Sequence, residues 1–284
     1  MKKVVLLDGY NLMYRARYSG MNKGEYSTIF NFFRGLRPLI EKFDPDLAYF
    51  VLEGAPKKRL AVDPDYKGQR VYNNDDNFSA QRKTIIKLLQ EFFPIQLVKH
   101  DDFECDDVIG FLADKHKVND KVTIISSDTD FIQCIDDNVE LYNPVRKLSI
   151  EKPDHDYVLW KSLKGDASDN IEGFKGIGDK KALMLCNNPE KLENFLNEDT
   201  SRVAKLNHNK FMIKLHDLTS ETNNIQYYNT VNNKNWDNLR TTFEEYSFKS
   251  MTNKDASWNK YIKTFDNLFE RYIQWFITMK HKEL

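Results

Sequence analysis

Short apolar runs alternate with longer amphipathic stretches along the first half of the chain. Four runs have the length of buried strands: VVLL (residues 4–7), LAYFVL (47–52), VTII (122–125) and LYNPV (141–145). Three stretches between them show helical periodicity: STIFNFFRGLRPLIEKF (27–43), SAQRKTIIKLLQEFF (79–93) and DDVIGFLADKH (106–116). Strands that alternate with helices favour an α/β fold with a mostly parallel sheet, whose ligands bind outside the carboxyl ends of the strands.

The pattern changes near residue 157, where strands become rare and helices dominate. We therefore expect an α/β domain over residues 1–157 and a helical domain over residues 158–284. Residues 197–235 are rich in Asn and Lys and only weakly periodic, so an extended or mobile arm is expected there. Large apolar residues return at helical spacing from Trp258 to Phe276, which favours packing against the body over base stacking.

The composition is that of an ordinary folded protein. Of the 284 residues, 40% are hydrophobic and 30% are charged, and no apolar run is long enough to span a bilayer, so no membrane association is expected. The three cysteines are isolated, which favours a reduced, cytoplasmic compartment. No Cys or His pairs have the spacing of zinc ligands, which argues against a zinc hydrolase. The net charge of −1 conceals an uneven distribution, because residues 57–70 are strongly basic and residues 101–107 strongly acidic.

Acidic residues follow the predicted strands and begin one predicted helix. In chain order they are Asp8, Glu53, Glu104, Asp106, Asp107, Asp128 and Asp130. A single acid at such a position is often only a helix cap or a turn residue. A parallel sheet would bring all of them to one edge, where two like charges ~4 Å apart repel by about 4 kcal/mol at an effective dielectric of ~20. Oxygen ligands without His or Cys point to Mg²⁺ or Mn²⁺, and a pair of such ions suits phosphoryl chemistry.

Basic and aromatic residues occur together at two places. In YKGQR, Lys67 and Arg70 are three residues apart, so both are able to reach one phosphate. Tyr66 beside them is suited either to stack on an unpaired base or to pack in the core. Arg15 and Arg17 follow the first acidic strand, where the alternative is a solvated surface.

The stretch LKGDASDNIEGFKGIGDKKA (163–182) combines acids with glycines and lysines. Asp166 and Asp169 are expected to face the metal site. The remainder resembles a helix–hairpin–helix turn, in which glycine lets backbone N–H groups approach a phosphate without reading sequence. The residues concerned are Gly173, Lys175, Gly176, Gly178, Lys180 and Lys181.

Taken together and in order, these motifs resemble those of the bacteriophage and bacterial 5′-nucleases, the flap endonuclease and 5′–3′ exonuclease family that includes phage RNase H. The resemblance covers roughly residues 1–190 and rests on LLDGYNLMYR, VLEG, YKGQR, FECDD, ISSDTDF and KGDASDNIEGFKGIGDKKA. It implies a PIN-like (resolvase-like) nuclease domain followed by a helical domain with a helix–hairpin–helix (H3TH) motif near residues 163–186.

The resemblance also implies residue roles. The expected metal ligands are Asp8, Glu53, Glu104, Asp106, Asp107, Asp128, Asp130, Asp166 and Asp169. Lys67 and Arg70 would contact the scissile phosphate as the catalytic cations. The expected nucleic-acid contacts are Tyr14, Arg15, Tyr66, Lys67, Arg70, Lys175, Gly176, Gly178, Lys180 and Lys181. A helical arch near residues 66–90 would admit a 5′ single strand, and hairpin carbonyls near Gly176 and Gly178 would hold K⁺.

The implied activity is a structure-specific 5′-nuclease, acting as flap endonuclease and 5′–3′ exonuclease. Two Mg²⁺ ions, with Mn²⁺ as a substitute, would support hydrolysis of branched DNA or RNA–DNA with a free 5′ end, leaving 5′-phosphates, as in primer removal during replication. A monomer is expected, with replication proteins as further partners, and a free-standing chain of this size suggests a bacteriophage.

Two features depart from the family pattern and keep alternatives open. Glu53 stands where the family usually has Asp, and Asp75 and Asp76 are unexpected beside a DNA strand. One alternative is a PIN-type ribonuclease that acts on single-stranded RNA, which needs neither the hairpin nor YKGQR. The other is a DNA-binding homologue whose catalysis is weakened at Glu53.

Overall fold

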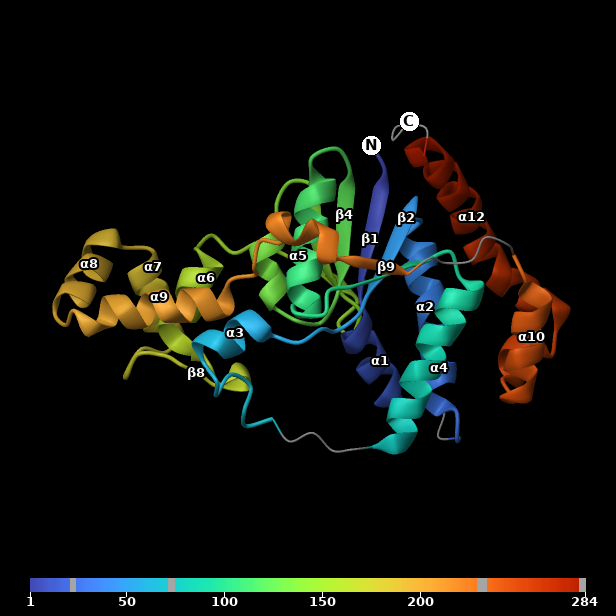
Figure 1. The fold of residues 1–284 in the computed structure, drawn as a ribbon, viewed down its shortest axis with the longest axis horizontal. Coiled ribbons are helices and arrows are strands. Elements are labelled where there is room, and N and C mark those ends of the chain that lie inside the picture. Colours follow the sequence, from blue (N-terminus) through green and yellow to red (C-terminus); the bar gives the residue numbers. More distant parts are fainter. Residues whose placement is uncertain (21–23, 71–74, 229–233, 281–284) are drawn as a thin grey trace.

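A seven-stranded sheet forms the centre of the protein (Figure 1). This computed structural model describes residues 1–20, 24–70, 75–228 and 234–280. The strands are β1 (Lys3–Asp8), β2 (Leu47–Val51), β3 (Gln96–Lys99), β4 (Lys121–Ile125), β5 (Val139–Asn143), β6 (Leu148–Ile150) and β9 (Gln226–Tyr228). Their order is β6-β5-β4-β1-β2-β3-β9, with β1 to β5 parallel and the two edge strands antiparallel to their neighbours.

The predicted strands are present, with corrections at the edges. β5 ends at Asn143 instead of residue 145, because Pro144 has no N–H to donate and the Asn143 side chain accepts hydrogen bonds from the next turn. The sequence pattern missed β3, β6 and β9. These strands are only three or four residues long, which is too short for a periodicity signal.

Helices cover both faces of the sheet. They are α1 (Gly9–Arg17), α2 (Ser27–Phe43), α3 (Lys57–Val62), α4 (Asp76–Phe92), α5 (Cys105–Lys117), α6 (Tyr157–Lys164), α7 (Asp179–Cys186), α8 (Pro189–Asn197), α9 (Ser201–Ile213), α10 (Trp236–Glu245), α11 (Lys249–Thr252) and α12 (Asp255–Lys280). One core lies between the sheet and α1, α2, α4, α10 and α12, and a second lies beneath α5. No helix among the described residues is long and apolar enough to cross a membrane.

The second half of the chain packs in two separate regions of the protein. Helices α6, α7 and α9 share a small core around Leu163, Phe174 and Leu206, on the left in Figure 1. The predicted boundary at residue 157 marks where these helices begin, but β9, α10, α11 and α12 pack against the first part of the chain. β9 pairs with β3, and the Tyr261 hydroxyl of α12 donates to the Phe33 carbonyl of α2 (3.3 Å).

Two expectations for this half have different outcomes. The expectation of an extended arm over residues 197–235 is wrong for residues 201–213, because they form α9. Residues 229–233 lie outside the described part. Packing of the C-terminal helix is confirmed, because its apolar residues from Trp258 to Ile273 are buried, apart from the partly buried Ile262 and the exposed Ile273. The side chain of Phe276 lies outside the described residues.

The strand order creates a crevice beside β1. The chain builds β2 and β3 on one side of β1 and β4 and β5 on the other. At such a switch point the connections leave in opposite directions, so the carboxyl ends of β1 and β4 border an open crevice. Asp8 ends β1, and Asp128 follows β4 by three residues, so both lie at this crevice.

Candidate active site

Asp8 lies where β1 turns into α1. Its Oδ1 accepts a hydrogen bond from the backbone N–H of Asn11 (3.0 Å) and so caps α1, while its Oδ2 accepts from the Ser126 hydroxyl (2.7 Å) at the end of β4. The side chain is buried. Burial raises the pKa of Asp8 to about 6, and the charge of Asp128 adds to the shift.

Glu53 and Asp106 share the electrostatic field of Asp8. Burial raises the pKa of Glu53 to about 7, and the charges of Glu104 and Asp8 also raise it. Burial raises the pKa of Asp106 well above its usual range, with Asp128 and Asp8 adding to the shift. The structure therefore brings acids from the ends of β1, β2 and β4 and from the start of α5 together, and their role as metal ligands stays a prediction.

A second group of carboxylates lies beside the first. One oxygen from each of Asp130, Asp166 and Asp169 lies within 4.8 Å of the others. Lys161 of α6 contacts Asp130 and lies 2.6 Å from Asp166 Oδ2. Burial alone would raise the pKa of Asp166, but hydrogen bonds from Lys161 and Ser168 outweigh it and lower the pKa. Burial raises the pKa of Asp130, although Lys161 opposes the shift.

A single open cleft of about 450 Å³ joins the two groups. Asp128 is exposed in it and raises the pKa values of Asp8, Asp106 and Asp130. The charged residues that line the cleft are Lys67, Arg70, Asp106, Asp128, Asp130, Lys161, Lys164, Asp166 and Asp169. The cleft therefore contains carboxylates from both groups together with four cations, Lys67, Arg70, Lys161 and Lys164.

Lys67 and Arg70 are held against this cleft by the loop that follows α3. The Lys67 N–H donates to the Asp169 carbonyl (3.0 Å), its Nζ contacts Glu104, and Arg70 Nη2 lies 2.6 Å from Asp169 Oδ1. Burial alone would lower the pKa of Lys67, but Glu104 and Asp169 outweigh it and raise the pKa, so the ammonium group stays charged. Lys67 has a φ of 56°, a left-handed conformation that is unfavourable for a lysine and typical of functional loops.

Comparison with known proteins identifies the family to which this site belongs. The family model described as "5'-3' exonuclease, N-terminal resolvase-like domain" matches residues 3–161. The chain belongs to the 5′–3′ exonuclease family. The 5′–3′ exonuclease of Mycoplasmopsis pulmonis is 31% identical over 72% of this chain and 73% of its own length. That of Aquifex aeolicus is 32% identical over 69% of this chain and 73% of its own length.

Solved structures agree with this assignment of the fold. T5 5′-exonuclease with bound zinc ions has a TM-score of 0.63 at 20% identity, covering 75% of this chain and 90% of that chain. A variant of the bacteriophage T5 D15 flap endonuclease, in a pseudo-enzyme–product complex with DNA and metal ions, has a TM-score of 0.61 at 21% identity, covering 75% and 89%. The predicted α/β fold class is confirmed, and the protein, as a 5′–3′ exonuclease family member, is a nuclease.

Asp107 lies beside Glu104 but does not line the cleft of this nuclease. Both of its oxygens accept from Arg59 of α3 (2.7 and 2.8 Å), and Oδ1 also accepts from the His216 N–H (2.9 Å). Arg59 and Asp107 are both buried, and Arg59 also contacts Glu104 (2.7 Å) and donates to the Met212 carbonyl (2.9 Å). Both oxygens of Asp107 are thus used in a buried ion pair that joins α3, α5 and the chain after α9, and its role as a metal ligand stays a prediction.

Tyr66 also differs from its predicted role. Its ring is buried in a small core with Ile171, so the core alternative is correct and base stacking on this ring is not supported. The hydroxyl lies 3.1 Å from Glu104 Oε2 and 3.1 Å from Asp169 Oδ2. Tyr66 therefore connects the two acids that hold Lys67.

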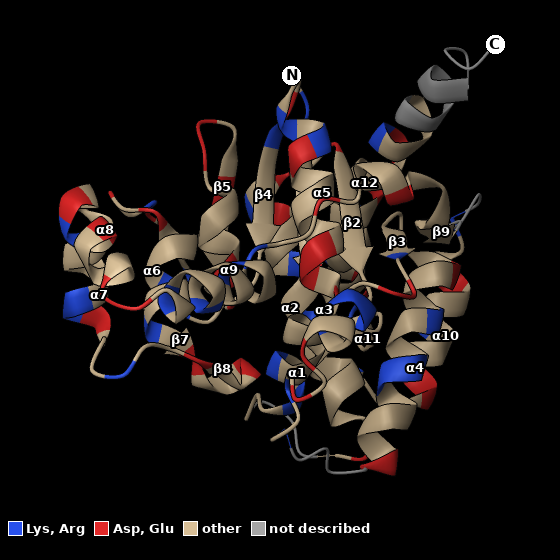
Figure 2. Ribbon diagram, turned by 60° about the vertical axis from the view of Figure 1, so that its left-hand side comes forward, with Lys and Arg blue, Asp and Glu red and all other residues tan. Residues whose placement is uncertain are grey.

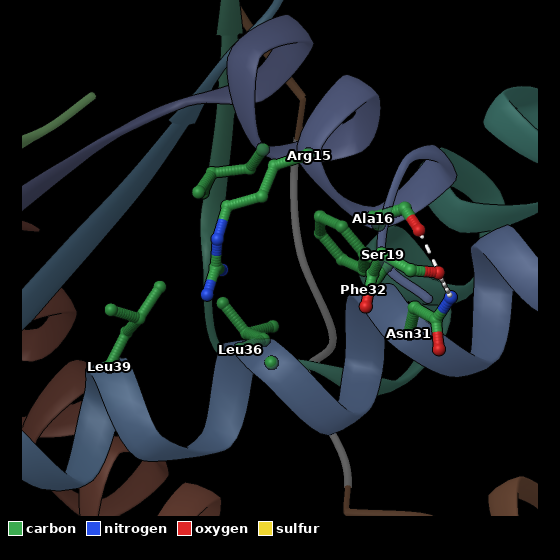
Figure 3. Close-up of a pocket in the computed structure, with 9 residues that line it drawn as sticks. Arg15, Ala16, Ser19, Asn31, Phe32, Leu36 and Leu39 are labelled. Carbon is green, nitrogen blue, oxygen red and sulfur yellow. Dashed lines mark hydrogen bonds between the residues drawn. The ribbon is translucent and has the colours of Figure 1, made fainter. Parts of the chain in front are cut away.

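Tyr14 and Arg15 point in different directions from α1. The Tyr14 ring is partly exposed and packs on Phe78 of α4, with ring centroids 4.9 Å apart, so a contact with a base stays a prediction. Figure 3 shows the Arg15 side chain extending from α1 toward Leu36 and Leu39 of α2. Burial there lowers the pKa of Arg15, and its contact with nucleic acid likewise stays a prediction.

The predicted hairpin lies between α6 and α7. It contains a two-stranded ribbon of β7 (Gly165–Asp166) and β8 (Ile171–Glu172), and the loop after it leads into α7. Gly176 has a φ of 75°, which favours glycine, and added side-chain atoms at Gly178 would meet nothing within 4 Å. The exposed lysines of this region are Lys175, Lys180 and Lys181, which lie around the start of α7 (Figure 2). The helix–hairpin–helix assignment and its nucleic-acid contacts stay predictions.

Sequence reasoning missed three side chains that organise the site. Lys161 bridges Asp130 and Asp166, Arg59 neutralises Asp107, and Ser126 donates to Asp8. The sequence did contain a signal for Ser126, because this residue directly follows the predicted strand at 122–125, where site residues are expected. Lys161 and Arg59 had none, because nothing in a lysine-rich helix tells which cation turns inward.

The Arg59–Asp107 pair generates a stability prediction. Asp107→Ala removes the bidentate partner of the buried Arg59 guanidinium and leaves Glu104 as its remaining carboxylate contact, so we expect it to lower the free energy of unfolding by about 3–5 kcal/mol. Asp106→Ala, at the next position, removes a carboxylate that its neighbours repel and should change stability by less than about 1 kcal/mol. Urea denaturation of both variants in EDTA measures the contrast, and equal losses would contradict it.

The raised pKa of Glu53 generates a pH prediction. A carboxyl whose folded pKa lies at about 7, above its ordinary value of 4.5, stabilises the fold at low pH and loses that contribution as the pH rises through 7. We expect the metal-free protein to lose about 2 kcal/mol relative to Glu53→Gln between pH 5.5 and 8.0. Parallel stability curves for the two proteins, measured in EDTA, would show that the pKa is not raised.

Proposed function

We propose that this nuclease is a divalent-metal-dependent, structure-specific 5′-nuclease that cuts branched DNA or RNA–DNA with a free 5′ end. The observation that carries the proposal is the cleft in which Asp130, Asp166 and Asp169 converge beside the fixed cations Lys67 and Arg70. The T5 D15 flap endonuclease, whose fold is similar, is described in complex with DNA and metal ions, which supports the same ligands here.

The donor set fits hard divalent cations. The acids of the two clusters offer carboxylate oxygens, and the three convergent ligands include no His or Cys, which favours Mg²⁺ with Mn²⁺ as a substitute. The residues that would hold the ions are Asp8, Glu53, Glu104, Asp106, Asp128, Asp130, Asp166 and Asp169. When bound, two such ions supply an activated water and neutralise charge on a phosphate.

The chain's own cations act on the phosphate. Lys67 and Arg70 already lie at the cleft with their charges fixed by Glu104 and Asp169, so little reorganisation is needed to stabilise charge that develops on the phosphate oxygens. The products would be 5′-phosphate and 3′-hydroxyl ends. Primer removal during replication is the process that fits such an activity.

The hairpin region would hold duplex backbone near the cleft. The exposed lysines around α7 and the open backbone near Gly176 and Gly178 are suited to phosphate contacts and, through carbonyl groups, to a K⁺ ion. We further propose that the protein acts as a monomer in the cytoplasm, together with replication proteins. Size-exclusion chromatography with light scattering tests the monomer.

A cleavage assay tests the function directly. A 5′-labelled flap duplex and a single-stranded RNA of matching length are incubated with the protein, each with Mg²⁺ and each with EDTA. We expect metal-dependent cutting near the flap junction and at least tenfold slower cutting of the RNA. Cutting of the RNA alone would establish a single-strand ribonuclease instead, and binding of the flap without any cutting would indicate a degenerate site.

Asp128→Asn tests the acidic cleft. The substitution removes a charge that the cleft presents to solvent, so we expect cleavage to fall by at least 1,000-fold, which corresponds to about 4 kcal/mol in the barrier. Binding of flap DNA, measured by fluorescence anisotropy in Ca²⁺, should stay within threefold, because phosphate contacts from the lysines remain. Asp137→Asn, an exposed acid in the turn before β5, is the matched control and should cut normally.

A further inference from the structure

Ser126 is a buried serine that lies between two acids of the site. The strands β1 and β4 are parallel neighbours, and their pairing ends with Leu7 opposite Ile125 (Figure 1). Asp8 and Ser126 are the next residues along the two segments, so both leave the same edge of the sheet. Ser126 is only 1% exposed, so the partners of its hydroxyl have to come from the protein.

The Ser126 hydroxyl uses both its donor and its acceptor capacity on these acids. It donates to Asp8 Oδ2 (2.7 Å) and accepts from the backbone N–H of Asp128 (3.0 Å). Because a backbone N–H is only a donor, the single hydroxyl proton is directed to the carboxylate. Asp8 is buried behind the cleft, whereas Asp128 is exposed in it. One side chain therefore connects a buried acid to an exposed one.

Further hydrogen bonds orient the two acids around this serine. Asp8 Oδ1 accepts from the Asn11 N–H (3.0 Å), so each oxygen of Asp8 is held by one donor. Asp128 Oδ1 accepts from the Asp130 N–H (2.9 Å). A carboxylate offers two lone pairs on each oxygen, so these bonds orient the acids and still leave lone pairs for a cation.

A second hydrogen-bonded pair joins the two chain segments that carry the acids. Asn11 Nδ2 donates to the Ser127 hydroxyl (2.7 Å), and the Ser127 N–H donates to Asn11 Oδ1 (3.1 Å). These bonds attach the first turn of α1 to the residue that follows Ser126. The relative placement of the two segments is therefore set by side chains as well as by the pairing of β1 with β4.

We propose that Ser126 is a positioning residue that holds Asp8 and Asp128 as a preformed pair of ligands for one divalent cation. This inference rests on the proposed function, in which both acids hold metal ions. Ser126 would act through the two acids, because its own hydroxyl is already bonded to them. Groups that hydrogen-bond to metal ligands fix the orientation of these ligands, and their removal typically costs about 10- to 100-fold in metal affinity or activity.

The first measurement is Mn²⁺ binding to the DNA-free protein, followed through the electron paramagnetic resonance signal of free Mn²⁺. Ser126→Ala removes both hydrogen bonds to the acids, so we expect at least one Mn²⁺ site to weaken by about tenfold or more. Ser127→Ala is the matched neighbour, because it leaves both of those bonds and the backbone bond to Asn11 in place. Its Mn²⁺ affinity should stay within threefold of that of the wild-type protein.

Flap cleavage at a series of Mg²⁺ concentrations separates positioning from a general loss of structure. For Ser126→Ala, we expect the half-maximal Mg²⁺ concentration to rise about tenfold, whereas the rate at saturating Mg²⁺ should fall less than threefold. Ser149→Ala is the control, because it removes an exposed hydrogen bond from a serine to a carboxylate, Glu140 Oε2 (3.1 Å), on the edge strand β6. This variant should bind Mn²⁺ and cut normally. Thermal unfolding in EDTA checks that each variant is folded at the assay temperature.

The outcomes distinguish this inference from the function on which it rests. If Ser126→Ala binds Mn²⁺ as tightly as the wild-type protein, or loses no more affinity than Ser127→Ala, Ser126 has no positioning role and the nuclease assignment stands. A lower rate at every Mg²⁺ concentration, with an unchanged half-maximal concentration, would likewise overturn the inference alone. A wild-type protein that binds no Mn²⁺ and cuts no flap in Mg²⁺ would overturn the proposed function, and the role of Ser126 with it.

Discussion

Repulsion among carboxylates at the carboxyl edge of the sheet is the constraint on which the rest of this structure depends. Parallel strands end at the same edge, so acids placed after β1, β2 and β4 have to meet there. Burial raises the pKa values of Asp8, Glu53 and Asp106, and the charges of the neighbouring carboxylates raise them further. Folding has to supply positive charge to this edge, because β1, β2 and β4 end without a cation and Lys99 at the end of β3 pairs with Asp101.

The positive charge comes from segments outside the sheet, and each contact fixes the segment that supplies it. Lys161 brings α6 to Asp130 and Asp166, and with α6 the small core of the helical region. Lys67 brings the loop after α3 to Glu104. Arg59 brings α3 itself to Asp107. The placement of the helical region and of the loop over the cleft is therefore partly an electrostatic consequence of the sheet.

The sequence predicts that acids gather at the carboxyl edge of the sheet, but not which acids line the cleft and which pair with buried cations. Alternating strands and helices force the acids after strands together, and this part of the site follows from pattern alone. Asp106 and Asp107 are adjacent in one helical turn and point about 100° apart, so one joins the cluster and the other meets Arg59. Nothing in their sequence distinguishes them, because the choice depends on where α3 packs. Tyr66 shows the same limit, because a tyrosine close to two cations is suited both to stack on a nucleic-acid base and to pack in the protein core.

Charge balance argues that the cleft needs more cations than the chain provides. Among the described residues, eight carboxylates gather at and behind the cleft once the Arg59–Asp107 pair is set aside, against three further cations that contact them, Lys67, Arg70 and Lys161. Fully ionised, they leave an excess of about five negative charges, which two divalent ions reduce to about one. Below pH 7, protons on Glu53 and Asp8 perform part of the same neutralisation. Under the proposed function, protons and metal ions would therefore compete for one set of oxygens, and a phosphate, itself anionic, would approach the cleft only when the ions prevail.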